Sequence, residues 1–150
     1  TIADEALKQE MSLGEALKRA GATVIHDAVV PPAELGERME ALLAAAEQSS
    51  AAAIVVGTYN AQFDANQREL LARLGGMKQR LNRRLIVAAL RNPYDLLLAD
   101  DIADALVAVY ESRKLALSSA GKALVGAIPW RGRLPVSLGT KYPRGTGVQS

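Results

Sequence analysis

Two short, unbroken apolar runs constrain the fold of this 150-residue chain more than any other feature of its sequence. Residues 51–57 read AAAIVVG and residues 85–90 read LIVAAL, so neither run contains a charged or polar side chain. Runs of this length are typical of parallel strands that are buried on both faces. We therefore expect a sheet that is covered by helices on each side.

Further helices and strands are predicted around these two runs. Apolar residues at three- and four-residue spacing indicate amphipathic helices, and β-branched runs bounded by proline or glycine indicate strands. The predicted helices cover residues 3–20, 33–48, 64–81 (with Gly75 and Gly76 as a potential break) and 112–125 (with Ser112 as N-cap), and a short helical turn covers 96–98. The predicted strands cover residues 22–30, 51–57, 85–90, 105–110 and 134–138. The two kinds of element alternate along the chain.

This alternation predicts the fold class. Strands separated by helices imply right-handed β-α-β units and hence parallel pairing. We predict an α/β domain over residues 1–150, a three-layer α/β/α sandwich with a mostly parallel, flavodoxin-like sheet. The segment 139–150 is rich in glycine, threonine and basic residues and is expected to be an irregular tail.

Composition narrows the classes of partner. The 18 basic and 16 acidic residues are interspersed and only 4% of the chain is aromatic, whereas single-strand binders pair basic grooves with stacking aromatics, so we expect no nucleic acid partner. No apolar run approaches the roughly 20 residues of a membrane span, and the N-terminus lacks a signal-peptide pattern, so we expect a soluble chain without a membrane partner. The compartment stays unknown.

The candidate site lies at the carboxyl ends of the predicted strands, where open α/β sheets bind ligands. Asn60 and Gln62 follow the first apolar run, and Arg91, Asn92 and Asp95 follow the second. These residues could contact a ligand or a neighbouring domain. They could equally be ordinary loop residues, with an Asn-Pro turn that an Arg91–Asp95 pair braces.

The sequence lacks the residues that several common catalytic, metal and phosphate-binding sites need. His26 is the only histidine and lies in a predicted strand, so neither a histidine metal cluster nor a Ser-His-Asp triad is expected. The carboxylates of Asp100 and Asp101 are merely adjacent, and Gly121-Lys122 lacks the following Ser or Thr of a phosphate-binding loop. We predict no catalytic residue, no metal and no cofactor.

Three segments in a fixed order resemble a known family. They are residues 54–61 (IVVGTYNA), 85–95 (LIVAALRNPYD) and 126–137 (GAIPWRGRLPVS), and the last continues to 142–147 (YPRGTG). Their order and spacing resemble the C-terminal domain of family-three glycoside hydrolases of the β-N-acetylhexosaminidase type. In enzymes of that type an N-terminal (β/α)8 barrel holds the nucleophilic Asp and the acid/base pair, and none of that barrel is in these residues.

The resemblance implies a noncatalytic C-terminal accessory domain of a hydrolase that cleaves O-glycosyl bonds of N-acetylglucosaminides. The expected partners are the barrel and a carbohydrate. The alternative is a free-standing flavodoxin-like module that binds a ligand or regulates another protein.

The start of the chain departs from the family pattern. Relatives open this domain with a buried strand before the helix that matches residues 12–19 (SLGEALKR), and the chain shows no such strand. We expect a fragment of a larger two-domain hydrolase whose sheet lacks its first strand. The unpaired edge that remains could support a homodimer.

Overall fold

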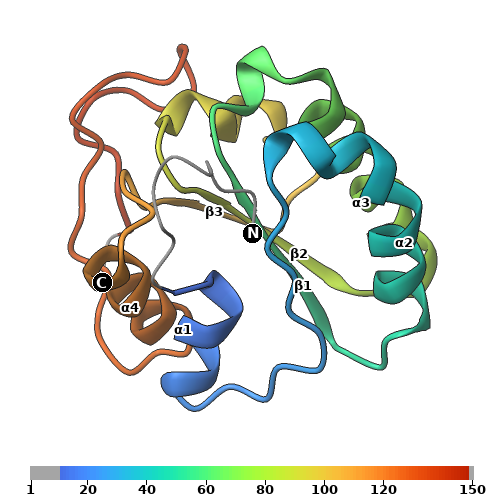
Figure 1. Cartoon of the computed structure of the whole chain (residues 1–150). Helices are drawn as coiled ribbons and strands as arrows, with labels where there is room; N and C mark the ends of the chain where they lie inside the picture. The colour runs from blue at the N-terminus through green and yellow to red at the C-terminus, as the bar shows by residue number, and fades with distance from the viewer. Residues whose placement is uncertain (1–10, 149–150) are drawn as a thin grey trace.

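The computed structural model describes residues 11–148 (Figure 1). Its α-helices are α1 (Leu13–Arg19), α2 (Leu35–Gln48), α3 (Ala65–Leu81) and α4 (Lys114–Leu124). Its strands are β1 (Ala53–Thr58), β2 (Arg84–Ala89) and β3 (Ala105–Ala108). Short 3₁₀ helices η1 (Pro32–Glu34), η2 (Ala61–Phe63) and η3 (Pro93–Leu98) lie in the connections. No described helix is long and apolar enough to cross a membrane.

The three strands form one parallel sheet in the order β1-β2-β3. Ile54 of β1 lies opposite Leu85, and Val87 of β2 lies opposite Leu106. Helices α2 and α3 lie on one side of the sheet and α1 and α4 on the other, as Figure 1 shows. The predicted α/β sandwich with a parallel sheet is confirmed.

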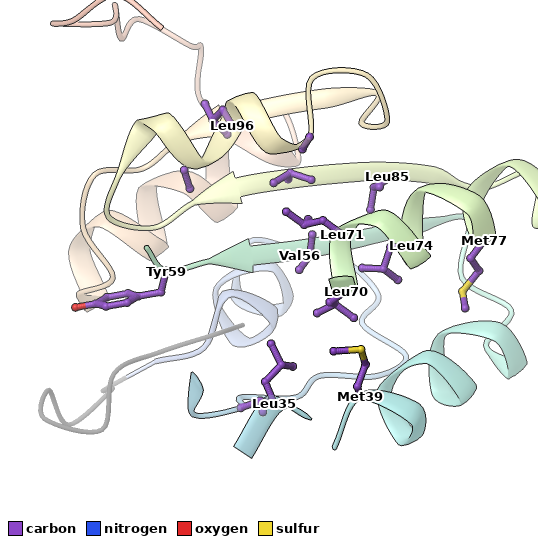
Figure 2. Close-up of a cluster of buried hydrophobic side chains, with 14 of the residues drawn as sticks. Leu35, Met39, Val56, Tyr59, Leu70, Leu71, Leu74, Met77, Leu85 and Leu96 are labelled. Atoms are coloured by element: carbon purple, nitrogen blue, oxygen red, sulfur yellow. The ribbon is translucent and has the colours of Figure 1, made fainter. Parts of the chain in front are cut away.

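Alternate residues of the central strand supply two hydrophobic cores, one on each face. Leu85 and Val87 belong to the larger core, which packs against α2 and α3 (Figure 2). Ala88 and Leu90 belong to the smaller core, which packs against α1 and α4. The apolar residues from Leu85 onward therefore face one core or the other, which explains why the apolar run has no polar interruption.

Local signals in the sequence fix the helix ends. The Asp64 side chain accepts from the amides of Asn66 (2.9 Å) and Gln67 (3.3 Å) and so caps α3, which continues through the potential break at Gly75. Gly121 lets α4 pack directly on α1, because a side-chain carbon there would lie 2.7 Å from the Ala16 carbonyl oxygen. Hydrogen bonding thus explains the cap at Asp64, and close packing explains the glycine at 121.

Three predictions about secondary structure are wrong. The predicted strand 22–30 is not formed: residues 22–29 have no strand assignment and Val30 takes part only in an isolated bridge, because the described sheet ends at β1, which pairs only with β2. Residues 134–138 form no strand either and contribute only an isolated bridge between Leu138 and Tyr142. The residue before α4 is Arg113 instead of Ser112. The predicted helix over 3–20 is confirmed for Leu13–Arg19, and its first part lies outside the described residues.

Candidate functional site

A buried carboxylate joins the carboxyl ends of the first two strands. Asp95, in η3, is fully buried. Its Oδ2 accepts from the Thr58 hydroxyl at 3.1 Å, and its Oδ1 accepts from the Gln62 amide at 3.3 Å. Thr58 ends β1 and Gln62 lies in η2, so one side chain ties together three elements. The structure thus brings together Gln62 and Asp95 from the predicted set.

Arg91 has a different partner from the one that the local-turn interpretation suggested. Its guanidinium donates to the Tyr59 hydroxyl and lies 5.4 Å from the centre of the tyrosine ring. Tyr59 is itself buried, while Arg91 is exposed. Since Asp95 binds Thr58 and Gln62, the suggested Arg91–Asp95 pair does not brace the turn. Arg91 instead forms a cation-π contact with Tyr59, at the edge where the carboxyl ends of the strands lie.

The two asparagines shape the backbone of the loops. Asn60 adopts a left-handed conformation (φ 52°), which asparagine tolerates better than most residues, at the start of η2. Asn92 caps η3, because its side-chain oxygen accepts from the Tyr94 amide at 3.1 Å. Both residues are half-buried. Asn60 and Asn92 therefore lie where the sequence predicts them, with backbone-shaping roles.

Gln67 is a buried residue that sequence reasoning did not single out. Its side-chain oxygen accepts from the Tyr59 amide at 3.0 Å, and its nitrogen donates to the Tyr59 carbonyl at 2.9 Å and to Asp64 at 2.9 Å. This amide holds the loop that leaves β1. The available signal was the sequence DANQ at 64–67, which is similar to a capping box at a helix start.

Large apolar side chains are exposed next to this hydrogen-bonded cluster. Phe63 is 83% exposed, and Tyr94 and Leu97 are 39% and 40% exposed. Phe63 lies in η2 and the other two lie in η3, and the two elements are in contact. We call these three side chains the apolar edge. Exposed aromatic and aliphatic groups on adjacent elements are typical of surfaces that another protein or domain covers.

The acids near this edge are already engaged. Asp95 is buried with both oxygens bonded, Asp64 caps α3, and Glu111 forms an exposed ion pair with Arg113 at 3.1 Å. Among residues 11–148 no group of three or more His, Cys, Asp or Glu residues could hold a metal ion. Asp95, Asp64 and Glu111 are thus each held by contacts within the domain.

The C-terminal segment covers part of the sheet edge at β3. The Leu134 amide donates to the Thr146 carbonyl at 2.8 Å, and the Gly145 amide donates to the Leu134 carbonyl at 2.8 Å. Tyr110 and Trp130 line a cavity of about 270 Å³ between this segment and β3. The two backbone hydrogen bonds therefore fold residues 145–146 back onto Leu134.

Asp100 holds this segment to the body of the domain, which makes its attachment sensitive to pH. The hydrogen bonds from Lys141 Nζ (2.8 Å) and from the Tyr142 hydroxyl hold the pKa of Asp100 below its ordinary value. A carboxylate with a lowered folded pKa stabilises the fold above its unfolded pKa of about 3.9, and this contribution is lost as the pH falls through the lower folded value.

We therefore expect Asp100→Asn to lower the thermal midpoint at pH 6 and to have a smaller effect at pH 3, which lies below the unfolded pKa of about 3.9, so that part of the stabilisation by the lowered folded pKa is already lost. Differential scanning calorimetry at the two pH values measures this. An equal effect of the substitution at both values would show that the charge of Asp100 does not hold the segment.

Comparison with known proteins gives one informative match. No protein-family model and no curated protein sequence matches the chain. Among solved structures, the chain is similar to a glycoside hydrolase family 3 β-N-acetylglucosaminidase from Paenibacillus sp. str. FPU-7, with 27% sequence identity and a TM-score of 0.71. The match covers 85% of this chain and 24% of that enzyme. The chain is thus related in structure to one part of a family 3 enzyme and spans about a quarter of its length.

Proposed function

We propose that the chain is the noncatalytic C-terminal domain of a family 3 glycoside hydrolase of the β-N-acetylhexosaminidase type. In this proposal an N-terminal (β/α)8 barrel of the same polypeptide hydrolyses the O-glycosyl bonds of N-acetylglucosaminides. The observation that carries the proposal is the match to only 24% of a β-N-acetylglucosaminidase. If this chain corresponds to about a quarter of such an enzyme, most of the enzyme's structure belongs to another part of a longer polypeptide.

The state of the acids supports a noncatalytic role. Glycoside hydrolysis uses two carboxyl groups about 5–9.5 Å apart on either side of the sugar bond. At the edge where an α/β sheet binds ligands, Asp95 points into the protein and Asp64 is occupied by the start of α3. Both therefore serve the fold, and the hydrolytic pair is assigned to the barrel.

The apolar edge is the proposed surface that meets the barrel. Phe63, the most exposed member of the apolar edge, would be removed from water by a docked domain, and burial of such a side chain contributes about 2 kcal/mol. Exposed Arg91 and half-buried Asn60, Gln62 and Asn92 lie on the same loops and would supply the polar contacts of the interface or of an outer wall of the sugar site. Interfaces between domains combine apolar and polar contacts in this way.

The proposal predicts a difference in activity between the chain and its parent. The full-length product of the gene should hydrolyse a chromogenic N-acetylglucosaminide, and the purified 150-residue chain should not. Absorbance of the released chromophore measures both. Hydrolysis by the chain alone, or nucleotide binding by the chain in calorimetry with no effect of the barrel, would instead favour an independent enzyme or an independent binding module.

A single substitution tests the docking surface in the same two proteins. Phe63→Ser should leave the thermal midpoint of the isolated chain nearly unchanged, because the side chain is 83% exposed there. In the full-length protein it should destabilise the docked domain by about 1–2 kcal/mol. Equal effects in the two proteins would show that Phe63 is not covered by the barrel.

A further inference from the structure

The cavity of about 270 Å³ beside β3 lies where open α/β sheets bind their ligands, beyond the carboxyl end of a strand. Leu106 and Ala108 of β3 line it, and so do Leu134 and Tyr142 of the C-terminal segment. Sites for drug-sized ligands measure roughly 300–1,000 Å³. A single ring therefore fits this cavity better than a larger molecule.

Three aromatic residues are among those that line the cavity, namely Tyr110, Trp130 and Tyr142. Tyr and Trp side chains combine an apolar ring face with one polar group. The Tyr142 hydroxyl donates to Asp100, which holds this side chain in place. Among residues 11–148 the Tyr110 hydroxyl and the Trp130 indole N–H have no hydrogen-bond partner, so both are available to a ligand.

Tyr110 has a backbone conformation that is unusual for a bulky residue. The sheet ladder continues past β3 to the Val109 amide, which donates to the Ala89 carbonyl at 2.9 Å. Tyr110 then enters the left-handed region at φ 67°, which glycine adopts readily and tyrosine does not. Strained residues of this kind cluster at ligand sites, where the surrounding structure holds them in place.

The C-terminal part of the chain is basic. Residues 121–150 contain five Lys and Arg residues and no Asp or Glu, although the whole chain has 18 basic and 16 acidic residues. The net charge of +2 therefore combines +5 in the last 30 residues with −3 in the first 120. The five residues are Lys122, Arg131, Arg133, Lys141 and Arg144.

Three of these basic residues lie near the cavity. Arg133 lines it, and its guanidinium donates to the Gly145 carbonyl at 3.1 Å. The two chain segments that carry Arg131 and Arg144 therefore lie side by side at this point, and both arginines are exposed. Among residues 11–148 no acid pairs with any of the three arginines, and no acid lines the cavity. The charge here is complementary to an anion.

We propose that this cavity binds a monosaccharide that carries a negatively charged group, either a phosphate or a carboxylate. The sugar ring packs on Tyr110 and Trp130, and Arg133 binds the anion, because a guanidinium group matches the geometry of both anions. The choice of a sugar rests on the proposed function. The members of the apolar edge are not among the residues that line this cavity, so the site is distinct from the proposed docking surface.

Chemical-shift titration of the complete 150-residue chain by NMR tests the site with three probes: glucose, glucose 6-phosphate and glucuronate. At least one charged sugar should give saturable shifts at the amides of residues 106–110 and 130–134, with a dissociation constant of about 1 mM. Glucose should bind at least about 10-fold more weakly, and added salt should reduce this difference. The tighter of the two charged sugars identifies the anion.

Two variants separate the roles of ring and charge. Arg133→Gln should abolish the preference for a charged sugar, and Tyr110→Gly should weaken binding of that sugar at least about 10-fold. Glycine adopts a φ near 67° without strain, so an intact thermal midpoint in Tyr110→Gly shows that the loss is not unfolding. Arg38→Gln is the matched control, because Arg38 is an exposed arginine on α2 that does not line the cavity, and it should bind as wild type does.

Saturable shifts with neither charged sugar would overturn the inference, and so would equal affinity for glucose and for both charged sugars. Inorganic phosphate that binds as tightly as glucose 6-phosphate would show that the ring contributes nothing. Unchanged binding in Tyr110→Gly or in Arg133→Gln would also contradict the site. The titrations need no barrel and measure no hydrolysis, so their failure is distinguishable from failure of the proposed function, which the activity of the full-length protein tests separately.

Discussion

Leu85→Ala is expected to lower the free energy of unfolding by about 4 kcal/mol, because it removes a fully buried side chain from the central strand. Leu85 lies in the larger core between the sheet and the pair α2 and α3 (Figure 2). The loss combines the transfer of the removed carbons with the cavity that the rigid surroundings leave behind. Urea unfolding followed by circular dichroism measures it.

Leu115→Ala is the matched control for this substitution. The change in chemistry is the same, but Leu115 is 84% exposed on α4, so we expect a change within about 0.5 kcal/mol. A comparable loss at the two positions would contradict the placement of β2 between two helical layers.

Asp95→Ala is the second substitution with a large expected effect, about 3 kcal/mol of lost stability. It leaves the Thr58 hydroxyl, which is buried, and the Gln62 amide without their acceptor, and each unpaired buried polar group costs about 1–3 kcal/mol. The substitution also disconnects η3 from β1 and η2. Amide chemical shifts of residues 58–63 should therefore change together with the unfolding midpoint.

Asp95→Asn separates the hydrogen bonds from the shape of the side chain. Asparagine keeps one acceptor oxygen and nearly the same volume, so we expect about 1 kcal/mol of lost stability. If the asparagine variant unfolds at the same denaturant concentration as wild type while the alanine variant is destabilised, the side chain contributes by packing alone. If neither variant differs from wild type, Asp95 does not join the strand ends.

The fold could be predicted from the sequence wherever the spacing of apolar residues distinguishes a strand from a helix. The runs around Ile54 and Leu85 were expected to be strands and form β1 and β2, and α3 keeps its periodic pattern through Gly75. The segment containing Ile25 shows the limit of such reasoning. Its composition favours a strand, but strand formation also depends on pairing, and the described sheet consists of β1, β2 and β3 alone.

The candidate site could be located from the sequence but not resolved into its contacts. The rule for strand ends indicated the loops that contain Gln62 and Asp95, and the structure joins these two residues. Side-chain direction within a loop has no periodic signature, so the sequence could not show that Asp95 turns inward while Phe63 turns outward. For the same reason the Arg91 contact with Tyr59 was not foreseen.

The length of the natural polypeptide tests most directly whether these residues are the accessory domain of a longer enzyme with a catalytic barrel. An antibody raised against the purified 150-residue chain can identify that polypeptide by immunoblot in cells that express the gene. A band several times longer than 150 residues is expected, and the precipitated protein should hydrolyse an N-acetylglucosaminide. A single band of about 150 residues, with no hydrolase in the precipitate, would be incompatible with an accessory domain of a larger enzyme.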